Sequence, residues 1–202
     1  MGNTRNSKLA ICAELSGAAA AAIQYAWQGL SSRFGPWTIS KAGTPRLTLL
    51  AGHFDTARAA AFMDAIELAS RQVGPFSVQL TGVVTVKSPA PLLGVGVTMT
   101  NDLRAAFGRF FDACPEAGLR ILPEYTAETW TPHVALTGAG VDAATLVAAE
   151  AYLRSHSFAW RCAIETVDLV RVDETGESRI ETWPLMGETE AVEATGTLSG
   201  RA

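Results

Sequence analysis

Residues 44–49 read TPRLTL and residues 131–136 read TPHVAL, and the two stretches align without a gap. The same offset places Asp55 on Asp142, and each aspartate stands where a helix is expected to begin. A Thr-Pro pair, an apolar strand and a capping residue agree at one offset. We therefore interpret the chain as two copies of one unit.

The hydrophobic pattern around these stretches gives each copy the order strand, helix, strand, helix, strand. We predict strands at 9–15, 46–50, 76–86, 93–99, 133–137, 158–164, 166–172 and 179–183, and helices at 16–34, 55–73, 100–111 and 142–153. The predicted fold class is α+β, with two pseudo-symmetric lobes. Each lobe is an antiparallel-rich sheet with helices on its outer face, and a cleft lies between the lobes.

The domain organisation follows from the same pattern. We expect one domain over residues 1–186, with lobe halves at about 7–86 and 92–186. Two prolines within 87–91 break any regular element and mark the linker between the halves. The small, polar and mildly acidic stretch 187–202 predicts a disordered tail.

The composition narrows the classes of partner. Hydrophobic residues make up 48% of the 202 residues, enough for a sizeable core, and the net charge is -4. An acidic balance disfavours long nucleic acid, although a small phosphorylated ligand needs only one or two local charges. The three isolated cysteines indicate reduced structural thiols. Because the sequence shows no apolar leader and no membrane span, we expect a cytoplasmic protein. We also expect it to be a monomer.

The two aligned strands carry the candidate site residues. Because a strand alternates its faces, Arg46 and Thr48 point to one side, and so do His133, Ala135 and Thr137. Cationic or titratable groups at equivalent inward positions of the two copies indicate an anion site. Phosphate fits such a site, because the guanidinium of arginine donates two parallel hydrogen bonds and histidine donates or accepts a hydrogen bond near neutral pH.

On these motifs the chain resembles the 2H phosphoesterase superfamily, which includes the bacterial RNA 2′,3′-cyclic phosphodiesterases also called 2′-5′ RNA ligases. The resemblance extends over about residues 9–185, including both Pro-preceded strands and the closing stretch RIETWPL at 179–185. It implies one His-x-Thr/Ser motif per lobe. One histidine then acts as general base and the other as general acid on a 2′,3′-cyclic phosphate or a 2′-5′ linkage, the hydroxyls hold the phosphate, and no metal or other cofactor is needed.

Both motifs depart from this pattern. The first keeps its hydroxyl at Thr48 but has Arg46 in place of histidine, and the second keeps His133 but has Ala135 in place of the hydroxyl residue. The resemblance therefore assigns catalytic roles to His133 and Thr48. Arg46 can stabilise phosphate charge but cannot exchange a proton near neutral pH.

Other side chains are candidates to supplement the site. Thr137 shares the parity of His133 and either supplies a hydroxyl or ends the strand, while Lys41 either contacts phosphate or is solvated. Tyr125 and Trp130, in the long loop before the second motif, either stack on a base or close the core. His53 replaces the missing histidine only if a bulge near Gly52 turns it to the face of Arg46.

Three functions remain open from the sequence. The first is a divergent phosphoesterase acting on a small 2′,3′-cyclic or 2′-5′ linked nucleotide or RNA end, with His133 as general acid or base and Arg46 stabilising the phosphate. The second is an inactive pseudoenzyme that binds a nucleotide or phosphate. The third is a scaffold for a protein partner. Turnover and ligand binding by the same preparation separate them.

Overall fold

The computed structural model describes residues 7–41, 43–87, 90–173 and 176–187, and it has the predicted α+β class. The strands are β1 (Ser7–Glu14), β2 (Arg46–Phe54), β3 (Phe76–Val86), β4 (Leu92–Val97), β5 (Leu119–Ile121), β6 (His133–Ala135), β7 (Arg161–Ile164), β8 (Thr166–Asp173) and β9 (Gly176–Pro184). The helices are α1 (Gly17–Phe34), α2 (Ala59–Gln72), α3 (Asn101–Glu116) and α4 (Ala143–Leu153), with 3-10 turns at Pro36–Thr38, Thr56–Arg58 and Pro123–Tyr125.

The strands join into one sheet with the order β7-β3-β4-β6-β2-β1-β8-β9, and β5 pairs with β2 at one end. All neighbours within it are antiparallel. The two motif strands, β6 and β2, are neighbours in the middle of this order. The first strand of each half pairs with a later strand of the other half, β4 with β3 and β1 with β8, so the two sequence halves interlock.

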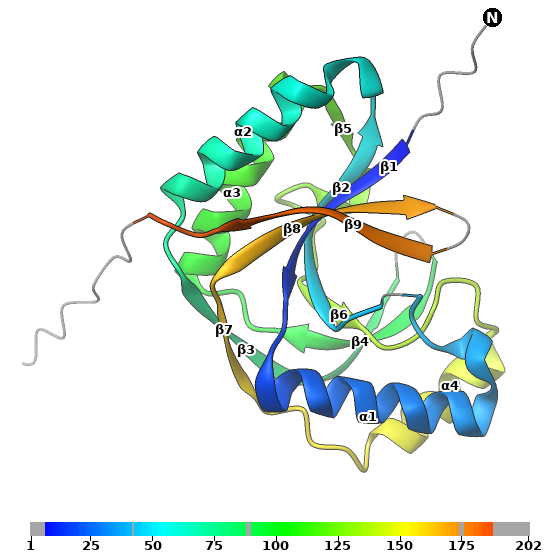
Figure 1. The fold of residues 1–202 in the computed structure, drawn as a ribbon. Coiled ribbons are helices and arrows are strands. Elements are labelled where there is room, and N and C mark those ends of the chain that lie inside the picture. Colours follow the sequence, from blue (N-terminus) through cyan, green and yellow to red (C-terminus); the bar gives the residue numbers. More distant parts are fainter. Residues whose placement is uncertain (1–6, 42, 88–89, 174–175, 188–202) are drawn as a thin grey trace, which may run out of the picture.

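The helices cover one face of the curled sheet and enclose the main core. α2 lies beside α3, and α1 lies beside α4 across the molecule, while the β8–β9 hairpin, at the sheet edge next to β1, runs between these two helix pairs (Figure 1). The core contains alternate strand residues, such as Leu47 and Leu49 of β2 and Val134 of β6, packed against helical side chains such as Phe62 and Phe110. The opposite face of the sheet is left for the motif residues.

The helix starts follow the predicted capping pattern in two cases. Thr100 accepts a hydrogen bond from the amide of Leu103 at the start of α3, and Asp142 accepts one from the amide of Thr145 at the start of α4. Asp55 caps the 3-10 turn that leads into α2 rather than α2 itself. Asp142 therefore caps a helix as predicted, whereas Asp55 caps the turn that precedes one.

The second strand differs from the prediction in length and regularity. β2 continues to Phe54 instead of ending at residue 50, because β5, which the sequence did not predict, pairs with its far end. Ile11 of β1 faces Leu50 whereas Cys12 faces Thr48, so Leu49 is an extra residue in β2. This β-bulge lets Leu49 and Leu50 both enter the core and reverses the alternation beyond them.

Further expectations concern the cysteines and the chain ends. Cys12, Cys114 and Cys162 are free and buried, as predicted. Residues 88–89 of the expected linker and 188–202 of the expected tail lie outside the described residues. None of the helices described is long and apolar enough to cross a membrane.

Candidate active site

The two motifs lie side by side in opposite directions. Leu47 of β2 pairs with Val134 of β6, so in this antiparallel register Thr48 stands across from His133, and Arg46 stands across from Ala135. Leu47 and Val134 point into the core under the helices. The four flanking motif positions therefore share the open face of the sheet, as the alternation predicted.

A cavity of about 660 Å³ opens over this face. Thr48, His133, Ala135 and Thr137 all line it, so the structure brings residues of both copies to one concave site. Its volume falls within the range of roughly 300–1,000 Å³ that is usual for small-molecule sites.

The imidazole of His133 is held in one orientation. Its Nδ1 lies 2.7 Å from the carbonyl oxygen of Thr131, and because a carbonyl only accepts, Nδ1 carries the proton and donates. In the neutral ring this leaves the lone pair on Nε2. Burial lowers the pKa of His133 below its ordinary value, and the hydrogen bond to Thr131 offsets part of that effect. The ring is therefore poised to accept a proton near neutral pH.

Gly94 of β4 makes room for this ring. A Cβ added at Gly94 would lie 2.9 Å from Cδ2 and 3.3 Å from Cβ of His133. β4 pairs with β6 at this point, with Gly94 opposite Ala135 and Gly96 opposite His133. Glycine at this position thus permits the imidazole to lie against the neighbouring strand.

The hydroxyl of Thr48 has a partner beneath the cavity. Its Oγ1 lies 3.7 Å from the Sγ of Cys12, and Tyr125 packs against the same buried cluster. Burial raises the pKa of the Cys12 thiol to about 12 and raises the pKa of Tyr125 well above its ordinary value. Both groups therefore stay protonated and add no charge near Thr48.

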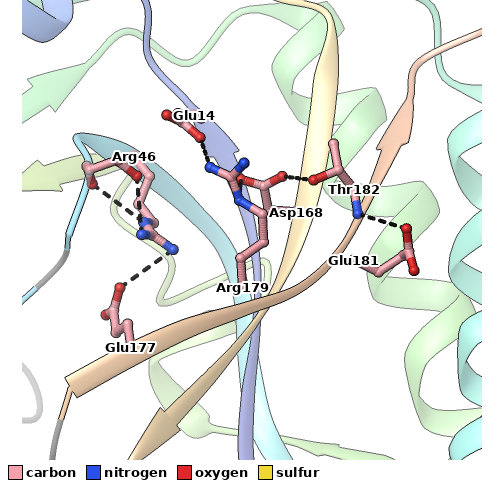
Figure 2. Close-up of polar contacts among 8 residues, drawn as sticks. Glu14, Arg46, Asp168, Glu177, Arg179, Glu181 and Thr182 are labelled. Atoms are coloured by element: carbon pink, nitrogen blue, oxygen red, sulfur yellow. Dashed lines mark hydrogen bonds and ion pairs between the residues drawn. The ribbon is translucent and has the colours of Figure 1, made fainter.

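Arg46 is engaged by a carboxylate from the other end of the chain. Its Nη1 lies 3.5 Å from Oε2 of Glu177 on β9 (Figure 2). Its Nε and Nη2 donate to the backbone and side-chain oxygens of Thr44. The Arg46 side chain is 9% exposed. Glu177 and Thr48 line the cavity, whereas Arg46 is not among the described side chains that do.

A second charged cluster adjoins this ion pair. Arg179 of β9 contacts the carboxylates of Glu14 and Asp168, and Asp168 also accepts a hydrogen bond of 2.6 Å from the hydroxyl of Thr182 (Figure 2). Glu14 stands across from Arg46 in the β1–β2 pair. The charges around the first motif are therefore largely internally paired, while His133 faces the cavity.

The second motif offers a hydroxyl further along the strand. Thr137 is buried, lines the cavity, and its Oγ1 accepts a hydrogen bond of 2.9 Å from the amide of Leu93. β6 itself ends at Ala135, two residues earlier than predicted, and a single bridge pairs Thr137 with Ile39. The Thr137 hydroxyl keeps its own proton for donation.

The alternative histidine lies elsewhere. His53 pairs with Lys8 of β1 and, because of the bulge at Leu49, shares the face of Thr48, but it is exposed and does not line the cavity. The bulge therefore exists, but it precedes Gly52 and does not bring His53 to His133.

The aromatic residues of the loops have different surroundings. Trp130 is buried, stacks on Phe107 with ring centroids 4.3 Å apart, and donates through Nε1 to the backbone oxygen of Thr48. It therefore closes the core, as one of the two interpretations held, while one edge reaches the cavity. Trp37 also lines the cavity and is 60% exposed.

The sequence interpretation overlooked two lysines and a carboxylate at the site. Lys8, Lys87 and Glu177 line the cavity together with the anticipated Lys41. Lys8 has the strand parity of Cys12, which is the one signal that could have found it. Glu177 could not be found, because its position depends on how the β8–β9 hairpin folds across the sheet. The described residues contain no cluster of three or more His, Cys, Asp or Glu suited to a metal ion.

Comparisons with known proteins match the chain along most of its length. The family model of the 2'-5' RNA ligase superfamily matches residues 18–176. No curated protein sequence is significantly similar. Among solved structures, TT0787 of Thermus thermophilus is 20% identical, with a TM-score of 0.64, and covers 90% of this chain and 100% of its own. Escherichia coli LigT bound to 3'-AMP is 14% identical, with a TM-score of 0.62, and the match covers 89% of this chain and 98% of the LigT chain.

The fold and the family model agree on the class of the protein. The fold is an α+β domain with a curled antiparallel sheet whose two motif strands lie at one cavity, and the solved structures share that fold. The chain belongs to the 2'-5' RNA ligase superfamily. The family resemblance inferred from the two motifs is thereby confirmed.

Proposed function

We propose that this chain is a phosphodiesterase with a single proton-transfer residue, acting on a small 2′,3′-cyclic or 2′-5′ linked nucleotide or RNA end. The observation that carries the proposal is the orientation of His133, whose donated Nδ1 proton leaves Nε2 available at the cavity. Thr48 stands across from it and supplies a hydroxyl to the phosphate.

The reaction requires one proton to be removed and one to be supplied. Nε2 of His133 takes the proton from the attacking hydroxyl, which is water for a cyclic phosphate or the ribose 3′-hydroxyl for a 2′-5′ linkage. The new P–O bond forms as the bond to the leaving oxygen breaks. Because Arg46 holds its proton, the leaving oxygen takes its proton from water or from the protonated His133.

The missing second histidine sets the expected rate. A positioned proton-transfer group contributes typically about 10²–10⁴-fold to the rate. We therefore expect slow turnover compared with family members that keep both histidines. Arg46 contributes positive charge beside the cavity, and the carboxylate of Glu177 partly neutralises that charge.

An exposed aromatic ring supports a nucleotide as the ligand. Trp37 borders the cavity with 60% of its surface exposed, whereas Trp130 already stacks on Phe107. Bases stack on aromatic rings with little sequence preference. We assign base stacking to Trp37, with Tyr125 contributing through its position beside Thr48. The complex of Escherichia coli LigT with 3'-AMP is consistent with this ligand class.

The alternative is a nucleotide- or phosphate-binding protein without turnover, and the Arg46–Glu177 ion pair favours it. A panel of 2′,3′-cyclic and 2′-5′ linked nucleotides distinguishes the two. Wild type, His133→Gln and the matched variant His156→Gln, whose histidine lies outside the cavity, are each assayed for turnover and for thermal stabilisation.

Three results of this panel are informative. Turnover that His133→Gln abolishes and His156→Gln preserves supports the phosphodiesterase. Stabilisation of the wild type by nucleotides without turnover supports the binding protein. If no nucleotide stabilises the protein or is turned over, both proposals are wrong, and the scaffold becomes the remaining interpretation.

A further inference from the structure

The lysines of this chain gather around one cavity. The 202 residues include three lysines, Lys8, Lys41 and Lys87, and all three line the cavity that contains His133. They come from different parts of the chain: β1, the loop before β2, and the residue directly after β3. In a chain of net charge -4 this gathering gives the cavity a positive rim.

The carboxylates of the cavity do not cancel this rim. Glu124 and Glu177 also line it, but the charge of Glu177 is offset by Arg46 at 3.5 Å. Lys41 and Lys87 are exposed and Lys8 is partly exposed, so their ammonium groups reach a ligand without a large desolvation cost. Lysine binds phosphate as a mobile point charge, which suits the successive phosphates of a flexible strand.

Two of the lysines lie toward one end of the motif pair. The amide of Ser40, next to Lys41, donates to the carbonyl of Leu136. Val86, next to Lys87, pairs with Leu92, whose neighbour Leu93 accepts from the amide of Thr137. Both lysines are thus anchored beside the end of the second motif at residues 136–137.

The third lysine lies toward the opposite end. Cys12 of β1 faces Thr48, and Lys8 lies four residues away, facing His53. Four residues of strand span about 13 Å. His53 lies further along β2 than Thr48, away from Arg46. Residues 136–137 follow Ala135 of β6, at the end of the site where Arg46 stands. The reacting position at Thr48 and His133 therefore lies between the lysines.

This arrangement of lysines distinguishes a 2′,3′-cyclic phosphate from a 2′-5′ linkage as the substrate, an inference that rests on the proposed function. A terminal 2′,3′-cyclic phosphate has further phosphates on one side only, whereas a 2′-5′ linkage inside an oligonucleotide has them on both sides. We propose that the cavity binds a short single-stranded oligonucleotide across its length. Lys8 contacts a phosphate on one side of the reacting 2′-5′ linkage, and Lys41 and Lys87 contact phosphate on the other.

Binding of labelled oligonucleotides tests this proposal. The probes are a 2′-5′ linked dinucleotide, a tetranucleotide with a central 2′-5′ linkage, and a tetranucleotide ending in a 2′,3′-cyclic phosphate. Affinity is measured against salt concentration in a His133→Gln background, so that turnover does not consume the probe. Lys8→Gln and the pair Lys41→Gln with Lys87→Gln are compared with Arg104→Gln, which removes an exposed cation of α3 outside the cavity.

The salt dependence reports the number of phosphate contacts, with a slope of about 0.7 per contact for single strands. We expect the centrally linked tetranucleotide to bind more tightly than the dinucleotide. Lys8→Gln should lower the slope by about 0.7. The double variant, which frees the single phosphate on the other side, should also lower it by about 0.7, while Arg104→Gln leaves it unchanged. Equal binding of dinucleotide and tetranucleotide, or a slope that Lys8→Gln leaves unchanged, would overturn the proposal.

The same data separate this proposal from the proposed function. Lysine-dependent binding of the tetranucleotide without wild-type turnover contradicts the phosphodiesterase but keeps the oligonucleotide site. Turnover of the dinucleotide that is indifferent to all three lysines keeps the phosphodiesterase and contradicts the oligonucleotide site. Preference for the cyclic-phosphate end, with loss only in the Lys41 and Lys87 variant, also contradicts the two-sided site.

Discussion

Leu47 pairs with Val134, and this one antiparallel contact fixes the geometry of the site. It places Thr48 across from His133 and Arg46 across from Ala135, all on the face opposite the helices. The hydroxyl that one copy keeps thus stands beside the histidine that the other copy keeps. The two residues that depart from the family motif, Arg46 and Ala135, likewise stand across from each other on the neighbouring strands.

Restoring the missing groups should raise the rate. We expect Arg46→His combined with Ala135→Thr to increase kcat by about 10²–10⁴-fold, because a second proton-transfer group is added where the leaving oxygen needs one. Steady-state turnover of the best substrate measures the effect. The control is Arg46→Gln with Ala135→Thr, which adds the hydroxyl without the titrating group. A similar gain in both variants would show that proton transfer is not the missing function.

Gly94 should matter chiefly through His133, although an added Cβ would also come within 3.1 Å of the backbone oxygen of Val134. In Gly94→Ala the new Cβ would approach Cδ2 of His133 to 2.9 Å, so the ring must turn out of its position. We expect kcat to fall at least tenfold, because displacement of a positioned catalytic group by about 1 Å costs on the order of 100-fold. The matched variant is Gly108→Ala in α3, where an added Cβ meets nothing within 4 Å.

The control variant has its own expected result. Gly108→Ala should leave kcat unchanged and stabilise the protein by up to about 1 kcal/mol, because alanine favours a helix over glycine. Chemical denaturation measures the free energy of unfolding. An unchanged kcat in Gly94→Ala, with a folded protein, would contradict the assigned position of His133.

Glu177 should restrain Arg46. We expect Glu177→Gln to tighten binding of inorganic phosphate, because the cavity loses a negative charge and the guanidinium gains freedom to turn toward an anion. The same change should lower the free energy of unfolding by about 1–3 kcal/mol, since Arg46 is 9% exposed and loses its ionic partner. Calorimetric titration and denaturation measure the two effects. Weaker phosphate binding would contradict a competition between Glu177 and the ligand.

The sequence predicted the parts of this site that depend on local pattern. The alignment of 44–49 with 131–136 predicted the two strands, and strand alternation placed Thr48 and His133 on the open face. The caps Thr100 and Asp142 followed from residue type and position. These predictions required only neighbours in the chain and the symmetry of the two copies.

The remaining features depend on contacts between distant segments. The bulge at Leu49 arises because β1 and β2 both have to bury apolar residues against the helices, and no local pattern announces it. The partner of Arg46 comes from β9, more than 100 residues along the chain. Lys8 and Lys87 come to opposite ends of one cavity through the pairing of strands across the sheet.

The pH dependence of kcat/KM tests most directly the claim that His133 is the single titrating catalytic group. Burial lowers the pKa of this histidine, so its neutral, proton-accepting form should persist to a pH below the ordinary value of about 6.5. Because Arg46 does not titrate near neutral pH, no second group should reduce the rate at higher pH. The predicted profile rises with pH through one apparent pKa below about 6.5 and then stays level to about pH 9. A bell-shaped profile, or a rise centred well above about 6.5, would contradict a single, partly buried, neutral histidine as the general base.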